Sequence, residues 1–251
     1  MFVDRQRDAF VSTRRYERYW QQAPNGQSLP YLDAVQFKII SDNVARSQAL
    51  SAGDIDGHVV NTPDALLSAV NSGRDGRTQI ITDSNLETDE TVLGFNTTKP
   101  PFDDPIARQA LEYGIDQQQM SAGIYQGLFP AAWGMFEESS QYYISRKDAG
   151  YPERDISKAR ELVHQYEQAH GQPLEFSTLV PPDTQYLAIA QTFQSQAAEL
   201  GMKVNVEAVE QTQLVARVVA AGNYQASWFV LWSSPAPDRA YIFLGTVPRK
   251  M

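Results

Sequence analysis

An apolar strand that stops at two prolines and passes directly into a helix is the feature that most restricts the fold of this chain. Residues 91–96 are mostly apolar, and prolines occupy positions 100–101. Proline cannot donate to a sheet ladder and favours extended backbone in the residue before it, so the strand must end here. Asp103 or Asp104 can cap a following helix, and Pro105 suits its first position. The segment therefore predicts a strand-to-helix connection inside an α/β protein.

The remainder of the chain alternates between short apolar runs and amphipathic segments. The expected strands are 10–14, 35–40, 58–60, 78–82, 91–96, 174–180, 204–209 and 227–232. The expected helices are 42–52, 63–70, 105–114, 117–126, 156–170, 184–200 and 211–221. Short connections between helices and strands favour a mainly parallel sheet in the second half of the chain. We expect two units, residues 1–93 and 94–251, with a hinge at Gly94, Phe95 and Asn96.

Composition excludes several classes of protein. The 251 residues are 42% hydrophobic and 20% charged, which is typical of a folded domain. The net charge of −9 does not favour nucleic acid as a partner. The chain has no cysteine, which excludes disulfides and thiolate chemistry. No apolar run approaches the roughly 18 residues of a membrane span, and the first residues lack the apolar core of a signal peptide.

Residues able to perform catalysis are scattered along the sequence. His164 and His170 share one predicted helix, but a spacing of six residues places them on different faces. The carboxylate pair at 103–104 is explained by helix capping. No nucleophile-elbow, zinc-protease or phosphate-loop motif occurs. We therefore expect no enzyme activity, no metal and no cofactor.

Aromatic side chains outside regular helices are better candidates for a binding site. Residues 128–152 have no periodicity and are rich in aromatics, and long irregular segments are often functional. Trp133 and Met135 lie in this segment and are predicted to contact a ligand. The alternative for Trp133 is packing of the loop against its own domain.

A second candidate set follows the last predicted strand. Trp232 ends this strand, and Ser233 and Ser234 follow it. Ligands of open α/β sheets bind just beyond the carboxyl ends of the strands, which favours these residues as ligand contacts. The alternative for Trp232 is a core position, which is also the expected role of Trp228.

Two polar residues complete the candidates. Asn96 ends a buried strand, where it either faces a cleft or caps the local backbone. Asp238 either contacts a ligand through a loop that folds back or caps a following helix.

Several segments, in this order along the chain, resemble the family 5 extracellular solute-binding proteins, which serve ABC importers of peptides, nickel and related solutes. These segments are Tyr19-Trp20, Leu29–Asp33, Ala49–Asp56, Gly94–Pro105 and Phe229–Ser234 followed by Asp238. The resemblance implies a type II-like periplasmic-binding-protein fold with two lobes and mixed or parallel sheets. It also implies that this chain is a fragment lacking both ends, with an incomplete first lobe and most of the second.

The resemblance further implies a function in transport. The protein would bind an oligopeptide or similar polar solute by hinge closure and deliver it to an ABC permease. It would be a periplasmic protein or a cell-surface lipoprotein, monomeric at full length. Peptide-binding members of the family carry an Asp three residues after the strand-end tryptophan, where it pairs with the ligand α-ammonium. Here that position is Pro235, which weakens the oligopeptide assignment.

The alternatives are a carbohydrate-binding importer component and a carbohydrate-active hydrolase. Tryptophan rings can stack on the apolar faces of sugars, and loose carboxylate pairs do not exclude a glycosidase. A third possibility is a binding-protein fold reused as an interaction module without transport.

Overall fold

The structure is a computed structural model of the chain. It describes residues 1–60, 63–74, 76, 78–81, 89–134, 136, 138 and 140–232. The chain forms two compact units, Met1–Ile80 (unit 1) and Ile81–Met251 (unit 2). No helix within the described ranges is both long and apolar enough to cross a membrane.

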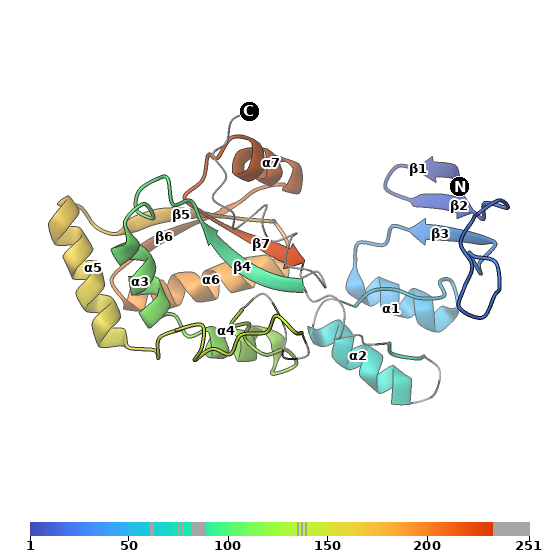
Figure 1. Cartoon of the computed structure of the whole chain (residues 1–251), viewed down its shortest axis with the longest axis horizontal. Helices are drawn as coiled ribbons and strands as arrows, with labels where there is room; N and C mark the ends of the chain where they lie inside the picture. The colour runs from blue at the N-terminus through green and yellow to red at the C-terminus, as the bar shows by residue number, and fades with distance from the viewer. Residues whose placement is uncertain are drawn as a thin grey trace. The chain divides into compact units, whose positions relative to one another are not determined.

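Unit 1 contains a small antiparallel sheet and two helices (Figure 1). Its strands, in spatial order, are β1 (Phe2–Gln6), β2 (Phe10–Arg14) and β3 (Ala34–Lys38). Its helices are α1 (Asn43–Ala52) and α2 (Pro63–Arg74). Two of these strands and both helices agree with the sequence. Strand β1 was not predicted from the sequence. The strand expected at 58–60 is wrong, and so is the one expected at 78–82 over its described residues 78–81; residue 82 lies outside the described residues.

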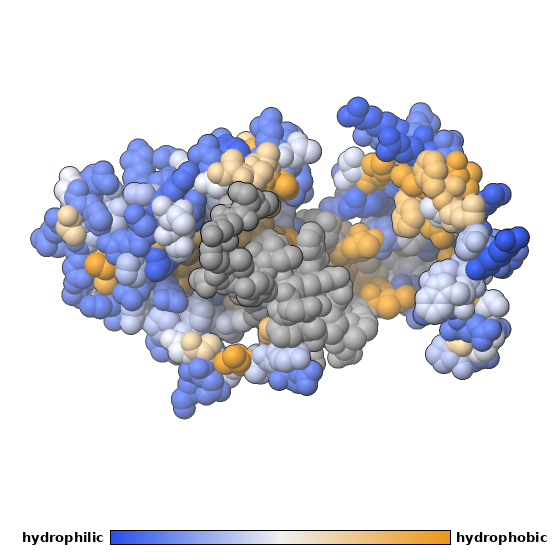
Figure 2. Space-filling model, turned by 45° about the horizontal axis from the view of Figure 1, so that its top comes forward, coloured by the Kyte–Doolittle hydropathy of each residue, from blue (hydrophilic) through white to orange (hydrophobic). Residues whose placement is uncertain are grey.

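The apolar side chains of unit 1 are largely open to solvent. Strand β3 alternates as a half-buried strand should, yet Phe37 is 62% exposed and Ile39 52% exposed. The register pairs Val11 with Phe37 and Thr13 with Val35, so these side chains share one face of the sheet. Figure 2 shows hydrophobic residues on the surface of this unit. Among its described residues, the only buried hydrophobic side chains are two alanines, Ala23 and Ala65.

Unit 2 is built on a four-stranded mixed sheet with the order β4-β7-β5-β6. The strands are β4 (Asp89–Phe95), β5 (Glu175–Val180), β6 (Lys203–Ala208) and β7 (Ala226–Trp232). Strand β5 is parallel to β6 and β7, and β4 is antiparallel to β7. The helices are α3 (Pro105–Gly114), α4 (Gln117–Tyr125), α5 (Ile156–His170), α6 (Thr184–Glu199) and α7 (Gln211–Val215), which continues as the π-helical segment η1 (Ala216–Ala220). The predicted α/β class is confirmed, with one antiparallel edge strand in an otherwise parallel sheet.

The core of unit 2 lies mainly on one face of this sheet. Helices α3 to α6 pack there around Phe102, Phe176 and Phe193, and Figure 1 shows α6 along this face and α7 on the other. Trp228 is 6% exposed and packs edge to face on Phe193, with ring centroids 5.6 Å apart. Its predicted core position is therefore confirmed. A smaller cluster of Leu179, Val209 and Leu214 lies under α7.

Aspartate caps explain where the helices begin. Helices α1, α3, α4, α5 and α6 each start after an aspartate whose carboxylate accepts a hydrogen bond from a backbone N–H of the first turn. These residues are Asp42, Asp104, Asp116, Asp155 and Asp183. Such caps satisfy N–H groups that have no partner within the helix. The predicted cap at the two-proline connection is confirmed for Asp104.

The predicted hinge segment lies inside the sheet of unit 2. Strand β4 pairs with β7 along its whole length, from Asp89 opposite Trp232 to Phe95 opposite Ala226. The division between the compact units falls earlier, after Ile80. Gly94 leaves room for the ring of Phe229, because a Cβ at position 94 would come within 2.4 Å of that ring. A hinge role for this segment stays a prediction.

A loop before β7 fastens the chain where it leaves β4. The backbone N–H of Asn96 donates to Gln225 O at 2.8 Å. The Asn96 amide donates to the carbonyls of Gly222 and Tyr224 at 3.1 and 3.0 Å. Gln225 Nε2 donates to Pro100 O at 2.8 Å, and its Oε1 accepts from the N–H of Ser177. We call residues 94–100 with the loop 222–225 the crossover clamp.

The substitution Gly94→Ala should destabilise unit 2. The new methyl group would overlap the Phe229 ring, and overpacking of this kind costs roughly 1–3 kcal/mol. Gly134→Ala is the matched control, because no described atom lies within 4 Å of a Cβ built there. Urea denaturation of the 251-residue chain should give a lower midpoint for G94A alone. Equal midpoints for the two variants would show that Phe229 moves aside at no cost.

Asp104 makes unit 2 sensitive to acid. Its carboxylate accepts from Ile106 N at 2.8 Å and lies 2.9 Å from His170 Nε2, at the end of α5. The hydrogen bond with His170 is the largest cause that lowers the pKa of Asp104, and the backbone bond and nearby cations lower it further.

Stability should therefore fall as pH falls. The Asp104 contribution is complete above the unfolded pKa of about 3.9 and is lost as pH drops through the lowered folded pKa. Asp104→Asn keeps an oxygen for the cap but removes the charge. Between about pH 5 and pH 2 the variant should lose less stability than the parent chain. Asp155→Asn is the control, because the Asp155 carboxylate caps α5 by accepting from Lys158 N at 2.9 Å. Parallel curves for D104N and the parent would contradict the assignment.

The two units should differ in resistance to protease. Residues 1–80 and 81–251 carry nine and twelve lysines and arginines, so trypsin has sites in both. The described residues of unit 1 expose most of their large apolar side chains, whereas those of unit 2 bury a continuous core. We expect mass spectrometry to show early cleavage within residues 1–80 and a resistant product that contains residues 89–232. Equal resistance of the two units would contradict the expected difference in their stability.

Candidate functional site

The carboxyl edge of the sheet in unit 2 is the candidate site that the fold favours. We use this name for the ends of β5 and β7 together with the first turn of α6, which starts after Val180 and Asp183. Strands β5 and β7 are parallel neighbours, so their carboxyl ends point in the same direction. This is the place where open α/β sheets bind ligands.

The strand-end tryptophan lies beyond the part of β7 that pairs with β5. The register between these strands covers Thr178 with Ala226 and Leu179 with Ser227 only. Strand β7 then continues to Trp232 with β4 as its paired neighbour. Trp232 is thus at the carboxyl end of a strand, as predicted. Ser233, Ser234, Asp238 and Met135 lie outside the described residues, so their ligand contacts stay predictions.

Asn96 lies at the opposite end of the β4–β7 pair from Trp232. Phe95 pairs with Ala226 and Asp89 with Trp232, so six residues of strand, about 20 Å, separate the two levels. The Asn96 side chain is 8% exposed, and its amide is used within the crossover clamp. Its Oδ1 also accepts from Thr98 Oγ1 at 2.7 Å. These contacts agree with the second of the two alternatives for Asn96 in the sequence analysis, which is capping of the local backbone and not contact with a ligand.

Trp133 packs within its own unit. The Arg146 guanidinium lies 4.2 Å above the Trp133 ring, and the Tyr151 ring meets it edge on at 5.4 Å. Gln117, in the first turn of α4, donates to the Tyr151 hydroxyl at 3.2 Å. These residues border a pocket of about 130 Å³ that also contains Asp116 and Arg154. The geometry agrees with the packing alternative for Trp133, and the face under Arg146 is already occupied.

An aromatic pair that the sequence did not single out lies at the carboxyl edge. The rings of Tyr125 and Phe129 meet edge to face at 5.4 Å. The Tyr125 hydroxyl accepts a hydrogen bond from Gln185 Nε2 at 3.0 Å, and Gln185 belongs to the first turn of α6. The one sequence signal for the turn between these two rings is Gln126-Gly127, and a glycine there is typical of any helix end. The sequence therefore does not mark the aromatic pair.

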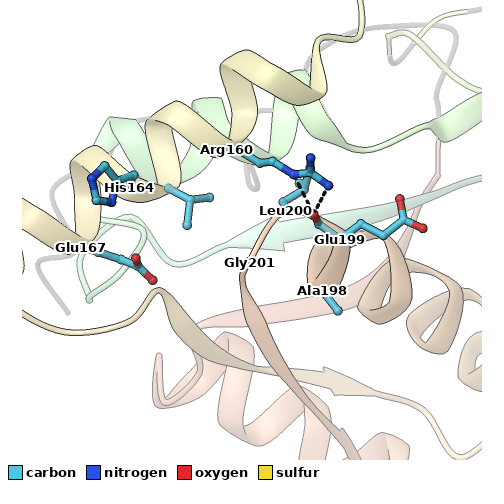
Figure 3. Close-up of a pocket in the computed structure, with 8 residues that line it drawn as sticks. Arg160, His164, Glu167, Ala198, Glu199, Leu200 and Gly201 are labelled. Carbon is cyan, nitrogen blue, oxygen red and sulfur yellow. Dashed lines mark hydrogen bonds between the residues drawn. The ribbon is translucent and has the colours of Figure 1, made fainter.

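A hollow in unit 2 lies away from this edge (Figure 3). It is an open groove of about 410 Å³ between α5 and the end of α6. Arg160 donates two hydrogen bonds to Glu199 O, at 3.0 and 2.8 Å, and so satisfies a carbonyl at the end of α6. His164 and Glu167 line the same groove. The groove lies at the opposite end of α6 from the carboxyl edge, and the Arg160 contact there caps the helix.

Charge is distributed unequally between the two units. Residues 1–80 carry nine basic and nine acidic side chains, whereas residues 81–251 carry 12 and 21. His164 contacts Gln168, and His170 contacts Asp104. Within the described ranges, no three His, Asp or Glu side chains are grouped closely enough to hold a metal ion.

Comparison with known proteins identifies the family. The model of the bacterial extracellular solute-binding proteins, family 5 Middle, matches residues 1–248. The glutathione-binding protein GsiB of Salmonella paratyphi A is 27% identical over 232 residues, which are 90% of this chain and 42% of GsiB. The chain therefore spans less than half the length of this relative.

Solved structures support the same fold. DppA of Helicobacter pylori, in complex with the peptide STSA, has a TM-score of 0.73 at 21% identity over 97% of this chain and 44% of its own. MelB of Agrobacterium fabrum, in complex with stachyose, has a TM-score of 0.69 at 19% identity over 92% of this chain and 39% of its own. The fold is thus that of a periplasmic binding protein, and the resemblance read from the sequence is confirmed. With a family model matched over nearly its whole length, this chain belongs to the bacterial extracellular solute-binding proteins, family 5.

Proposed function

We propose that this chain is part of the solute-binding component of an ABC importer. The observation that carries the proposal is the family match over residues 1–248, and the placement of an aromatic pair at a carboxyl edge supports it. Residues 1–93 would belong to the first lobe and 94–251 to the second. The lobes would close on the solute about the predicted hinge and then dock on a membrane permease. No covalent step is needed, so the protein would not be an enzyme.

The proposed location follows from the family. Its members are described as extracellular, and we propose that this protein lies in the periplasm or, as a lipoprotein, on the cell surface. At full length it would act as a monomer that meets its permease at the membrane.

The first candidate solute is a short peptide or a similar polar molecule. The support is the named ligands of two similar proteins, glutathione for GsiB and a peptide for DppA. In the proposed site, Trp232 at the end of β7 and the following residues Ser233, Ser234 and Asp238 would contact the solute. Because Pro235 occupies the anchor position for an α-ammonium group, the solute would be held by its other groups.

A carbohydrate is the second candidate. MelB was solved in complex with stachyose, and its fold is similar to that of this chain. Trp133 and Met135, in the long aromatic loop, would then be the contacts for sugar faces. Asn96 would contribute to either solute only if the crossover clamp rearranged, since its amide is engaged there.

Calorimetry on the longest polypeptide that the gene encodes tests the proposal. The probes are glutathione, N-acetylglutathione, the peptide STSA and stachyose. We expect binding of at least one of them, and equal affinity for the free and acetylated forms of glutathione where it binds. A charge-assisted hydrogen bond is worth roughly 1.5–3 kcal/mol, so a preference of that size for the free amine would contradict the role of Pro235. Turnover of a bound probe would show an enzyme, and no binding by any of them would argue against this solute class.

A further inference from the structure

We propose that Phe129 is a solute-contact residue of the carboxyl edge, and that its ring stacks on a flat or apolar face of the bound molecule. The inference deepens the proposed function and rests on it. It comes from the local structure of residues 121–129, where an exposed aromatic ring is held in one position by several independent contacts.

The backbone before Phe129 adopts an uncommon conformation. Helix α4 ends at Tyr125, and the next two residues, Gln126 and Gly127, have φ angles of 53° and 76°. Glycine adopts the left-handed region freely, but a glutamine there is strained. Such strain persists where the surrounding structure enforces it, and it is concentrated at functional sites. Here it reverses the chain so that Phe129 returns over the last turns of α4.

Three contacts then fix the reversed segment. The backbone N–H of Leu128 donates to Tyr125 O at 2.9 Å. The Ser121 hydroxyl donates to Phe129 O at 2.7 Å, which ties the backbone of Phe129 to the helix one turn earlier than Tyr125. The Tyr125 ring meets the Phe129 ring edge to face. Tyr125 is itself fixed, because it packs against the core and its hydroxyl accepts from Gln185.

Despite these contacts, Phe129 remains 43% exposed. The restraint therefore does not serve to bury the ring. A ring that is already ordered loses little conformational freedom when a ligand covers it, so its burial contributes more fully to affinity. Trp133, four residues later, differs because the Arg146 guanidinium already covers one face of its ring.

The position of Phe129 agrees with such a contact. Gln185 connects Tyr125 to the first turn of α6, which follows the carboxyl end of β5. The pair thus presents an aromatic face at the edge where ligands of this class of sheet bind. The exposed face of the Phe129 ring favours a solute with a planar group, such as a peptide unit, or with the apolar face of a sugar ring.

The test compares Phe129→Ala with Tyr143→Ala, which removes a comparably exposed ring (37%) from the same irregular loop. Both variants are titrated with glutathione, the peptide STSA and stachyose in the longest polypeptide that the gene encodes. We expect F129A to weaken the probe that binds the parent protein at least tenfold, and Y143A to leave its affinity within twofold. Phe129→Tyr keeps the aromatic face and should restore the affinity. Both alanine variants should keep the parent melting temperature within about 2 °C, because neither ring is buried.

A direct readout separates contact from an indirect effect. With 4-fluorophenylalanine at position 129, addition of the binding probe should shift the fluorine resonance, and the same label at Phe136 should shift less. If the parent protein binds a probe and F129A binds it equally well, or the resonance does not move, the inference is wrong while the proposed function stands. If the parent protein binds none of the probes, the proposed function fails for these solutes and the inference fails with it.

Discussion

The antiparallel pairing of β4 with β7 is the interaction on which the architecture of unit 2 depends. It adds the strand before the two prolines to a sheet that is otherwise formed by strands much later in the chain. Two features make this pairing specific. Gly94 admits the Phe229 ring over the β4 backbone, and the loop 222–225 binds the chain as it leaves the strand. The helix α3 can then start at Asp104 in a fixed direction, which positions its packing against α5 and α6.

The same pairing determines which residues can share a binding site. An antiparallel strand pair places the start of one strand beside the end of the other, so Trp232 lies beside Asp89 and far from Asn96. The crossover clamp engages the Asn96 amide within unit 2, whereas the proposed ligand contact Trp232 lies at the opposite end of the strand pair. The turn after α4 also bears on the proposed binding site. It places the Phe129 ring against Tyr125, whose hydroxyl contacts the first turn of α6, and it uses a left-handed backbone conformation at Gln126 to do so.

The sequence predicted unit 2 well because its signals are local. Aspartate caps and the glycine after α5 define helices whose predicted bounds, 105–114 and 156–170, agree with the structure. Strand β1 was missed because its polar residues show no alternation, and the pairing that makes it a strand is with β2. The site was predicted less completely. The strand end at Trp232 can be read from an apolar run, but the contact between Tyr125 and Gln185 joins residues 60 apart, which no local pattern reports.

In unit 1, local signals predict a strand correctly but do not predict whether its apolar face is covered. The alternation of Val35, Phe37 and Ile39 predicts a strand with one covered face, and the strand forms, yet the face stays open. Burial of apolar area is the dominant favourable term in folding, and the two buried alanines among the described residues of this unit contribute little of it. The relatives are more than twice as long as the part that this chain matches. A sheet of this pattern requires a further apolar surface against its open face, so the stability of unit 1 should depend on contacts that the strands β1 to β3 cannot make among themselves.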